Sequence, residues 1–339
     1  PVQQPVRDLA SDGAQPDQPN PQRRVLHLAI LSAVALLLRE TDIERIGEMR
    51  PVMDAVEAAM TSLGEGNAHN QSRRRLFPPG GVLNVMFATW PAGGLSGLKT
   101  YTVAGGRARF LVILYDLEGQ LIAMIEADRL GTLRTGAATG VAARRLTPPG
   151  PKTVALIGTG WQAHTQARAL REALEISELR VFGRDAERRR RFAEELGAQA
   201  APSAEAAVRG ADVVVTMTTS AEPVFEASWV QPGALVVGAG SNFPNRAELP
   251  PELIHSARAV VVDELETARL ESGDLLRAGY DLDQALELGA VLAGKASLPA
   301  GDAPVIFESH GLALWDVAAG STVLEPARAQ GLGEEVHLF

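Results

Sequence analysis

The chain has 339 residues, of which 46% are hydrophobic and 22% are charged, as in a folded protein long enough for two domains. Its formal net charge of −9 excludes the basic surface that nucleic-acid binding requires. The chain has no cysteine, which excludes disulfides, thiolate nucleophiles and cysteine zinc sites and fits a reducing compartment. No metal site is predicted.

The N-terminal part of the chain divides into a polar and an apolar segment. Residues 1–22 are rich in proline, glutamine and aspartate, so we predict a flexible tail there. The apolar run from Val25 to Leu38 resembles a secretory signal, but it follows a long polar leader and no small-residue cleavage site comes after it. The run is also too short to span a membrane. We therefore expect it to be the first buried element of a cytoplasmic protein.

The next segment predicts a small α+β unit. Residues 54–63 have apolar positions at helical spacing. Residues 67–81 are rich in arginine, proline and glycine and are expected to form a loop. From 82 to 121 short apolar runs alternate with turn residues, which indicates an antiparallel sheet. A helix of small residues is expected at 126–146, and the Pro-Pro-Gly at 148–150 is the best domain boundary.

After this boundary, strands alternate with helices. Strands are expected at 153–158, 179–183, 211–218, 234–240 and 259–263, and helices near 162–174, 186–196 and 250–255. Such alternation is typical of a parallel, doubly wound sheet. The predicted fold class is therefore α/β, with a Rossmann doubly wound sheet beside a smaller α+β domain.

A glycine turn follows the first of these strands. Gly158, Thr159, Gly160, Trp161, Gln162 and Ala163 form a GxGxxA pattern that opens a helix. The first glycine permits the tight turn, the second lets the backbone approach a pyrophosphate, and the small third residue permits close packing of helix on strand. Free N–H groups at the helix start then bind the phosphates. A nicotinamide dinucleotide is the predicted ligand.

The tip of the second strand bears on the choice between NADP(H) and NAD(H). NAD sites place a carboxylate there for the ribose 2′-hydroxyl, whereas this strand ends in Gly183-Arg184. An arginine there would pair with a 2′-phosphate. NADP(H) is therefore favoured, and NAD(H) stays an alternative because Asp185 is close by.

Several short motifs together resemble those of one family. In chain order they are Arg73 ahead of Val85-Met86, the glycines before Lys99, Leu133–Ala138, the turn at Gly158 with Gln162, Gly238–Asn242, Arg246 with Glu248-Leu249, Glu271–Asp274, and Glu308–Gly311 before Asp316. Over roughly residues 65–320 this set resembles the ornithine cyclodeaminase/mu-crystallin family. The first 45 residues match poorly.

The resemblance implies two domains, a homodimer and a nicotinamide cofactor. Residues 23–148 with 320–339 would form the substrate-binding and dimerisation domain, and residues 149–319 the NAD(P)-binding Rossmann domain. Family members act on small α-amino or α-imino acids, as ornithine cyclodeaminases, cyclic ketimine reductases or alanine dehydrogenases, while mu-crystallins also bind thyroid hormone.

Site residues can be assigned by the same resemblance. A substrate carboxylate needs cationic partners, and the family pattern gives this part to Arg73, Lys99 and Arg134. Thr216 and Thr218 follow a buried strand and are expected to lie against the cofactor. The remaining expected cofactor contacts are Arg134, Thr135, Gly238, Ala239, Gly240, Ser241, Arg246 and Ser309.

Two positions depart from the cyclodeaminase pattern. Asn242 stands where those enzymes carry the aspartate that activates water, and an amide is no general base near neutral pH. Asn84 stands where they carry a glutamate that holds the substrate amine. Both changes argue against ornithine deamination, and both residues stay in the predicted site.

Hydride transfer is the chemistry that these changes leave intact. Lys99 is the first candidate proton donor, because burial beside Arg73 and Arg134 would lower its pKa. His310 is the second candidate for proton donation and substrate contact, since the ordinary pKa of histidine suits proton exchange near pH 7. We predict an NAD(P)H-dependent reductase of a small α-imino acid such as Δ1-pyrroline-2-carboxylate, or the reverse dehydrogenase. The alternatives are an ornithine cyclodeaminase and a mu-crystallin-like binding protein.

Overall fold

The computed structural model describes residues 34–338. The tail predicted for 1–22 and residues 25–33 of the first apolar run lie outside the described residues. The end of that run is strand β1 (Val34–Leu38), whose inner side chains are buried. In the described range, no helix is long and apolar enough to cross a membrane.

The first sheet, sheet A, has the strand order β15-β1-β6-β5-β4-β3-β2, and all neighbours are antiparallel except β1 and β6. The antiparallel sheet predicted within 82–121 is confirmed, and it is extended on both sides. Besides β1, its strands are β2 (His69–Leu76), β3 (Gly81–Trp90), β4 (Leu95–Ala104), β5 (Arg107–Asp116), β6 (Leu121–Glu126) and β15 (Glu334–His337).

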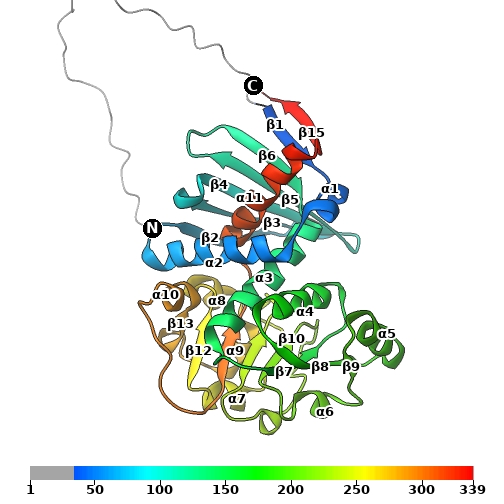
Figure 1. Ribbon diagram of the computed structural model, residues 1–339. Helices are drawn as coiled ribbons and strands as arrows, with labels where there is room; N and C mark the ends of the chain where they lie inside the picture. The colour runs from blue at the N-terminus through cyan, green and yellow to red at the C-terminus, as the bar shows by residue number, and fades with distance from the viewer. Residues whose placement is uncertain (1–33, 339) are drawn as a thin grey trace, which may run out of the picture. The chain divides into compact units, whose positions relative to one another are not determined.

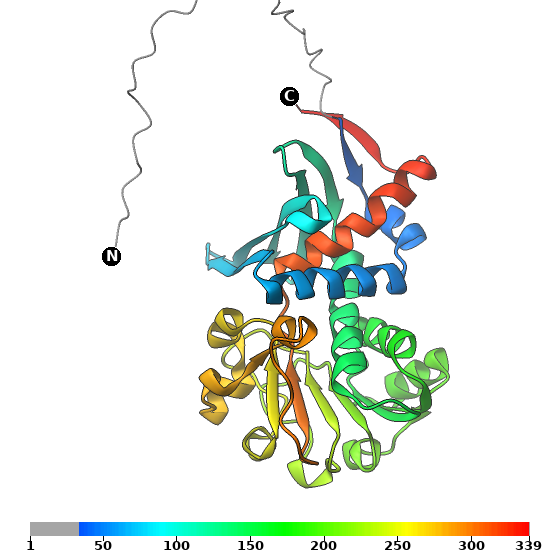
Figure 2. The ribbon, with the colours of Figure 1, turned by 60° about the vertical axis from the view of Figure 1, so that its left-hand side comes forward.

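Helix α11 (Ala313–Ala329) packs on sheet A, and its contacts run across β2, β3, β4 and β5 (Figure 2). Helix α2 (Met49–Glu65) lies against α11 and α3 (Asp128–Leu146), which in turn packs on α4 (Trp161–Ala173) (Figure 1). The helix predicted at 54–63 is confirmed as part of α2, and the one predicted at 126–146 is confirmed as α3, which begins two residues later. Because α3 consists largely of alanine, glycine and threonine, other helices approach it closely.

Sheet B is parallel throughout, in the order β13-β12-β14-β11-β10-β7-β8-β9. The predicted doubly wound sheet is confirmed. Its strands are β7 (Lys152–Ile157), β8 (Ile176–Phe182), β9 (Gln199–Ala200), β10 (Val213–Thr216), β11 (Leu235–Gly238), β12 (Ala259–Val262), β13 (Leu286–Glu287) and β14 (Val305–Glu308).

Both faces of sheet B are buried, as a doubly wound sheet requires. Successive residues of one strand belong to different apolar clusters: Val213 and Val215 of β10 lie in the cluster shared with α3 and α4, while Val214 lies in the other. The strands therefore consist of unbroken valine, alanine and isoleucine runs rather than alternating ones.

The remaining helices are mostly short. They are α1 (Glu40–Ile46), α5 (Ala186–Leu196), α6 (Ala204–Val208), α7 (Pro251–Ser256), α8 (Leu265–Glu271), α9 (Gly273–Ala278) and α10 (Leu288–Leu292), with single 3₁₀ turns at Pro91–Gly93, Ala227–Trp229 and Leu282–Gln284.

One prediction was wrong: the loop expected at 67–81 is largely strand β2. Its sequence, HNQSRRRL, has no apolar alternation because its inward side chains meet polar groups of the site instead of an apolar core. The alternation of apolar and polar residues by which strands are recognised is therefore missing from this segment.

Candidate functional site

A groove lies at the carboxyl ends of three strands of sheet B. Strand β7 is flanked by β8 on one side and β10 on the other, so the chain winds in opposite directions from this point. Open α/β sheets bind ligands at such a switch point. The groove has a volume of ≈ 600 Å³ and is lined by residues that follow β7, β8 and β10.

The glycine turn after β7 has the geometry that a dinucleotide needs. Gly158 has φ +124°, and a Cβ there would lie 2.2 Å from the carbonyl oxygen of Met217. At Gly160, by contrast, a Cβ would meet nothing within 4 Å, so the backbone faces open space at the start of α4. Open space in front of free helical N–H groups fits a pyrophosphate. The residues present therefore fit a nicotinamide dinucleotide.

The tip of β8 forms the far end of the groove. Gly183, Arg184, Asp185 and Arg188 line it. The carboxylate of Asp185 accepts the N–H of Arg188 at 2.9 Å and caps helix α5. This carboxylate is thus engaged in capping, while Arg184 is among the residues that line the groove.

A second cavity of ≈ 250 Å³ adjoins the groove, since Gly160 lines the first and Gln162 the second. Apolar and aromatic side chains form part of its wall, namely Val82, Tyr101, Val103, Phe110 and Phe243. Three cations, Arg73, Lys99 and Arg134, also line it, and no aspartate or glutamate is among its lining residues.

Most residues predicted for the site line one of these two cavities. Those along the groove are Gly158, Thr159, Gly160, Gly183, Arg184 and Thr218. Those around the second cavity are Arg73, Asn84, Lys99, Arg134, Thr135, Gln162, Ala239, Gly240, Ser241, Asn242, Ser309 and His310. The predicted residues that line neither are Trp161, Ala163, Thr216, Gly238 and Arg246.

A β-bulge in β2 turns Arg73 inward. Gln71 pairs with Phe87 and Arg74 with Val85, so Ser72 and Arg73 together face the one residue between those partners. A bulge changes the alternation of side chains. Arg73 is consequently buried, in an ion pair with Glu271. The next arginine along, Arg74, is exposed.

Lys99 and Arg134 share one buried carboxylate. Asp316 Oδ1 lies 2.8 Å from Lys99 Nζ and 3.2 Å from Arg134 Nε, and Asp316 itself is fully buried. Burial and the charges of Arg134 and Arg73 lower the pKa of Lys99 to about 8, while Asp316 opposes that change. The predicted decrease of this pKa is confirmed, and its value is suited to proton exchange near neutral pH.

Positive charge exceeds negative charge around the second cavity. Glu271 pairs with both Arg73 and Arg75, the latter at 2.8 Å, and Asp316 pairs with both Lys99 and Arg134. In these two ion-pair clusters, four cations thus share two carboxylates in a largely buried setting. An anionic ligand supplies the missing charge best.

A buried carboxylate joins the walls of the two cavities. Glu248 Oε1 accepts the N–H of Thr218 at 2.7 Å, and its Oε2 accepts the N–H of Gly240 at 2.7 Å. Thr218 lines the groove and Gly240 the second cavity. Burial raises the pKa of Glu248 to about 7.

This carboxylate also corrects one predicted contact. Thr216, expected against the cofactor, is fully buried, and its hydroxyl donates to Glu248 at 3.0 Å instead. Side chains alternate between the two faces of β10, and the side chain of Thr216 lies on the face where Glu248 is buried. Thr218, two residues further and beyond the strand, does line the groove.

The other four predicted residues that line neither cavity have different surroundings. Ala163 is fully buried, as close packing of helix on strand requires, and a Cβ on Gly238 would lie 2.4 Å from Glu308 Oε1. Arg246 donates to the carbonyl of Thr219 at 3.1 Å. Trp161 is 57% exposed, with the guanidinium of Arg129 over its ring.

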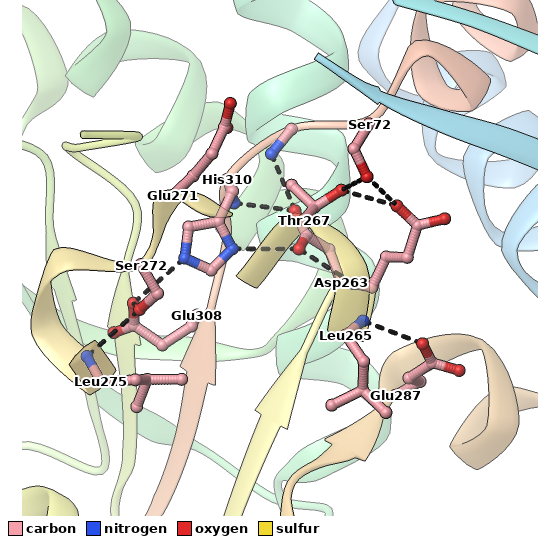
Figure 3. Close-up of polar contacts among 12 residues, drawn as sticks. Ser72, Asp263, Leu265, Thr267, Glu271, Ser272, Leu275, Glu287, Glu308 and His310 are labelled. Atoms are coloured by element: carbon pink, nitrogen blue, oxygen red, sulfur yellow. Dashed lines mark hydrogen bonds and ion pairs between the residues drawn. The ribbon is translucent and has the colours of Figure 1, made fainter. Parts of the chain in front are cut away.

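His310 differs most from its prediction. Its ring is buried between Asp263, 3.1 Å from Nδ1, and Glu308, 3.5 Å from Nε2 (Figure 3). These carboxylates raise the pKa of His310 to about 10 despite burial, so the ring holds its proton near neutral pH. The argument from an ordinary histidine pKa is therefore wrong here.

Asn84 and Asn242 line the second cavity as expected. Asn84 is buried on β3 opposite Tyr101, and the carbonyl oxygen of Asn242 accepts from Arg75 at 3.1 Å. Neither position offers a carboxylate.

The prediction assigned no role to the buried carboxylates of the site, although four of them lie in the motifs quoted above. Asp316, Glu271, Glu248, Asp263 and Glu308 are all buried. The available signal was that acidic residues occur beside small or apolar neighbours in the segments around 248, 271, 308 and 316, where a solvated charge is not expected.

Comparison with known proteins identifies the family. Residues 33–331 match the ornithine cyclodeaminase/mu-crystallin family. The chain belongs to this family. It is 30% identical to the ketimine reductase mu-crystallin of Mus musculus over 308 residues, which are 86% of this chain and 97% of that protein.

Solved structures of family proteins have the same fold. An archaeal alanine dehydrogenase dimer with bound NAD superposes with a TM-score of 0.84 and 30% identity, covering 90% of this chain and 100% of that one. The Δ1-pyrroline-2-carboxylate reductase of Thermococcus litoralis, in complex with NADH and L-proline, superposes with a TM-score of 0.82 and 27% identity, covering 89% and 100%.

Proposed function

We propose that this member of the ornithine cyclodeaminase/mu-crystallin family is an NAD(P)H-dependent reductase of a small α-imino acid, and in the reverse direction an amino-acid dehydrogenase. The observation that carries the proposal is the second cavity, which adjoins the groove and has three lining cations but no lining carboxylate. A site of this kind selects a small molecule with a carboxylate and an uncharged remainder.

The roles of the residues follow from their positions. Arg73 and Arg134 hold the substrate carboxylate, with Glu271 and Asp316 fixing their side chains. The bound cofactor supplies the hydride. Lys99, with its pKa lowered to about 8, gives a proton to the substrate nitrogen and takes it back in the reverse direction. The apolar wall keeps water away from the imine.

A cyclodeaminase is a weaker interpretation of the same site. Displacement of ammonia by water needs a general base close to the substrate, and a diamine needs an anion for its second nitrogen. Asn84 and Asn242 supply neither, and the other residues that line the cavity include no carboxylate.

The test is stoichiometry. With Δ1-pyrroline-2-carboxylate or Δ1-piperideine-2-carboxylate, we expect one NAD(P)H consumed per imine, followed at the nicotinamide absorbance. Release of ammonia and proline from ornithine at comparable turnover, without net change of that absorbance, would refute the proposal. Tight binding of NAD(P)H without turnover of any imine or amino acid would instead favour a binding protein of the mu-crystallin kind.

NADP(H) is the proposed cofactor. Arg184 lines the end of the groove at the tip of β8, and the nearby carboxylate of Asp185 is engaged in capping α5. Arg184→Ala is expected to raise the Kd for NADPH about tenfold or more and to leave the Kd for NADH within twofold. Equal effects on the two cofactors would reject a 2′-phosphate role.

We further propose a homodimer through sheet A, with residues 23–148 and 320–339 as the substrate-binding and dimerisation domain and residues 149–319 as the cofactor domain. Phe87 is 51% exposed and borders an apolar groove formed by β2, β3, β4 and β5. Phe87→Asp is expected to give a monomer by light scattering, while a dimer unchanged in mass would exclude this face.

A further inference from the structure

The buried histidine beneath the site ties together three separate segments. His310 follows β14, its partner Asp263 follows β12, and Glu308 is the last residue of β14. Glu308 accepts in turn from the hydroxyl of Ser272 at 3.0 Å, at the junction of α8 and α9 (Figure 3).

Asp263 also fixes the main chain beside this ring. Its Oδ2 accepts the N–H groups of both His310 and Gly311 at 2.7 Å, while its Oδ1 faces the ring. One carboxylate therefore holds the side chain and the backbone of the segment that links β14 of sheet B to α11 on sheet A.

The same segment touches both arginines that are proposed to bind the substrate carboxylate. The carbonyl oxygen of His310 accepts from Arg73 at 3.4 Å. Gly311 has φ +93°, and a Cβ on it would lie only 2.6 Å from Nη1 of Arg134. If this segment were displaced, the carbonyl oxygen that accepts from Arg73 and the glycine against which Arg134 packs would both move.

We propose that His310 is a positioning residue: its ring, paired with Asp263 and Glu308, holds the segment from Ser309 to Gly311 in the conformation that places Arg73 and Arg134 for the substrate carboxylate. This role depends on the proposed function in one respect, namely that the ligand of Arg73 and Arg134 is the carboxylate of the substrate.

The surroundings of the ring favour positioning over proton transfer. The side chain is 1% exposed and lies between the carboxyl groups of Asp263 and Glu308, so its proton has no short route to the cavity. Asp274, from α9, is a further buried acid: burial raises its pKa to about 7, and the charge of His310 opposes that change. A proton-transfer group needs contact with the substrate, whereas here the backbone borders the cavity and the ring lies behind it.

The first test measures binding of an unreactive carboxylate. His310→Gln is expected to raise the Kd of pyrrole-2-carboxylate for the NADPH complex at least tenfold, and to change the Kd of NADPH by less than twofold in a fluorescence titration. The matched control is His255→Gln, because His255 is exposed and bonds a carbonyl oxygen. This control is expected to leave both constants unchanged.

The second test separates positioning from catalysis by pH dependence. In His310→Gln, kcat/KM for imine reduction is still expected to fall as the pH rises through about 8, because Lys99 is unchanged. An unchanged Kd for pyrrole-2-carboxylate, together with a hundredfold loss of kcat and a lost pH limb, would make His310 an acid and overturn the proposal.

A measurement on the unmodified protein covers the case in which the variant does not fold. The chain has six histidines, whose ring nitrogens can be followed by ¹⁵N NMR. One ring is expected to stay doubly protonated from pH 6 to pH 9, and titration of all six near pH 6.5 would refute the ion pairing that holds the ring of His310. Absence of imine reduction would defeat the proposed function, whereas the NMR titration tests the ion pairs of His310 independently of that function.

Discussion

Lys99 is the residue whose replacement tests the proposed chemistry most directly. It is nearly fully buried, and Lys99→Met removes its charge while keeping a side chain of similar length. A positioned general acid contributes about 10²- to 10⁴-fold to a rate. We therefore expect Lys99→Met to lower kcat/KM for imine reduction by a factor in that range. Lys295→Met is the control, since Lys295 is an exposed lysine that donates to a backbone carbonyl.

The pH profile gives the magnitude independently. In the reductive direction Lys99 must carry its proton, so activity is present below its pKa and is lost as the pH rises through it. With a pKa of about 8, the protonated fraction falls from about 0.9 at pH 7 to about 0.1 at pH 9. The expected loss is about tenfold. With the ordinary lysine pKa of 10.5, the loss over the same range would be only a few per cent.

The assay is initial-rate kinetics in both directions. The rate of L-proline oxidation should show the opposite trend and rise between pH 7 and 9, because in this direction the unprotonated amine of Lys99 acts as the base. Ionisation of the free imine also affects the pH profile of imine reduction. This effect is the same for the wild-type protein and for Lys99→Met, so comparing the two profiles removes it. Loss of less than tenfold in the variant, or the same profile in both proteins, would refute the assignment of Lys99.

Three further results are expected. Gly158→Ala should destabilise the protein by about 1–3 kcal/mol and weaken NAD(P)H binding, because its φ is positive and a Cβ would meet Met217; wild-type melting temperature and Kd would contradict this. Glu248→Gln places an NH₂ group against an N–H donor and should raise the Kd of NAD(P)H about tenfold. Fluorescence titration measures this Kd, and an unchanged value would reject the role of Glu248 in joining the walls of the two cavities. Burial raises the pKa values of Glu248, Glu264 and Asp274 to about 7. The folded state then binds more protons than the unfolded state from about pH 4 to 7, so these groups should lower the melting temperature as pH rises through that window. A smaller decrease is expected in Glu248→Gln, and identical profiles for the two proteins would reject this contribution.

The fold was largely predictable because its signals are local. The glycine turn at 158–163 and the unbroken valine runs of sheet B report directly on a strand, a turn and a helix start. The cations at 73, 99 and 134 were also found, by resemblance, and the structure brings them around one cavity.

Long-range pairing accounts for what the sequence did not predict. The ring of His310 is determined by Asp263, which lies 47 positions away, and the side chain of Lys99 by Asp316, 217 positions away. No local pattern contains such a pairing. The bulge that turns Arg73 inward is equally invisible, because three consecutive arginines give no period from which to choose the buried one.

The pairing of β1 with β15 has a consequence for the order in which the chain folds. All strands of sheet B lie between residues 152 and 308, so this sheet can form from one continuous stretch. Sheet A is completed only when the final helix and strand are present, with Val34 opposite His337. Asp316 belongs to that last stretch. On a growing chain, the nucleotide groove is therefore expected to form before Lys99 and Arg134 receive the carboxylate that organises them, so that nucleotide affinity appears in time ahead of catalytic competence.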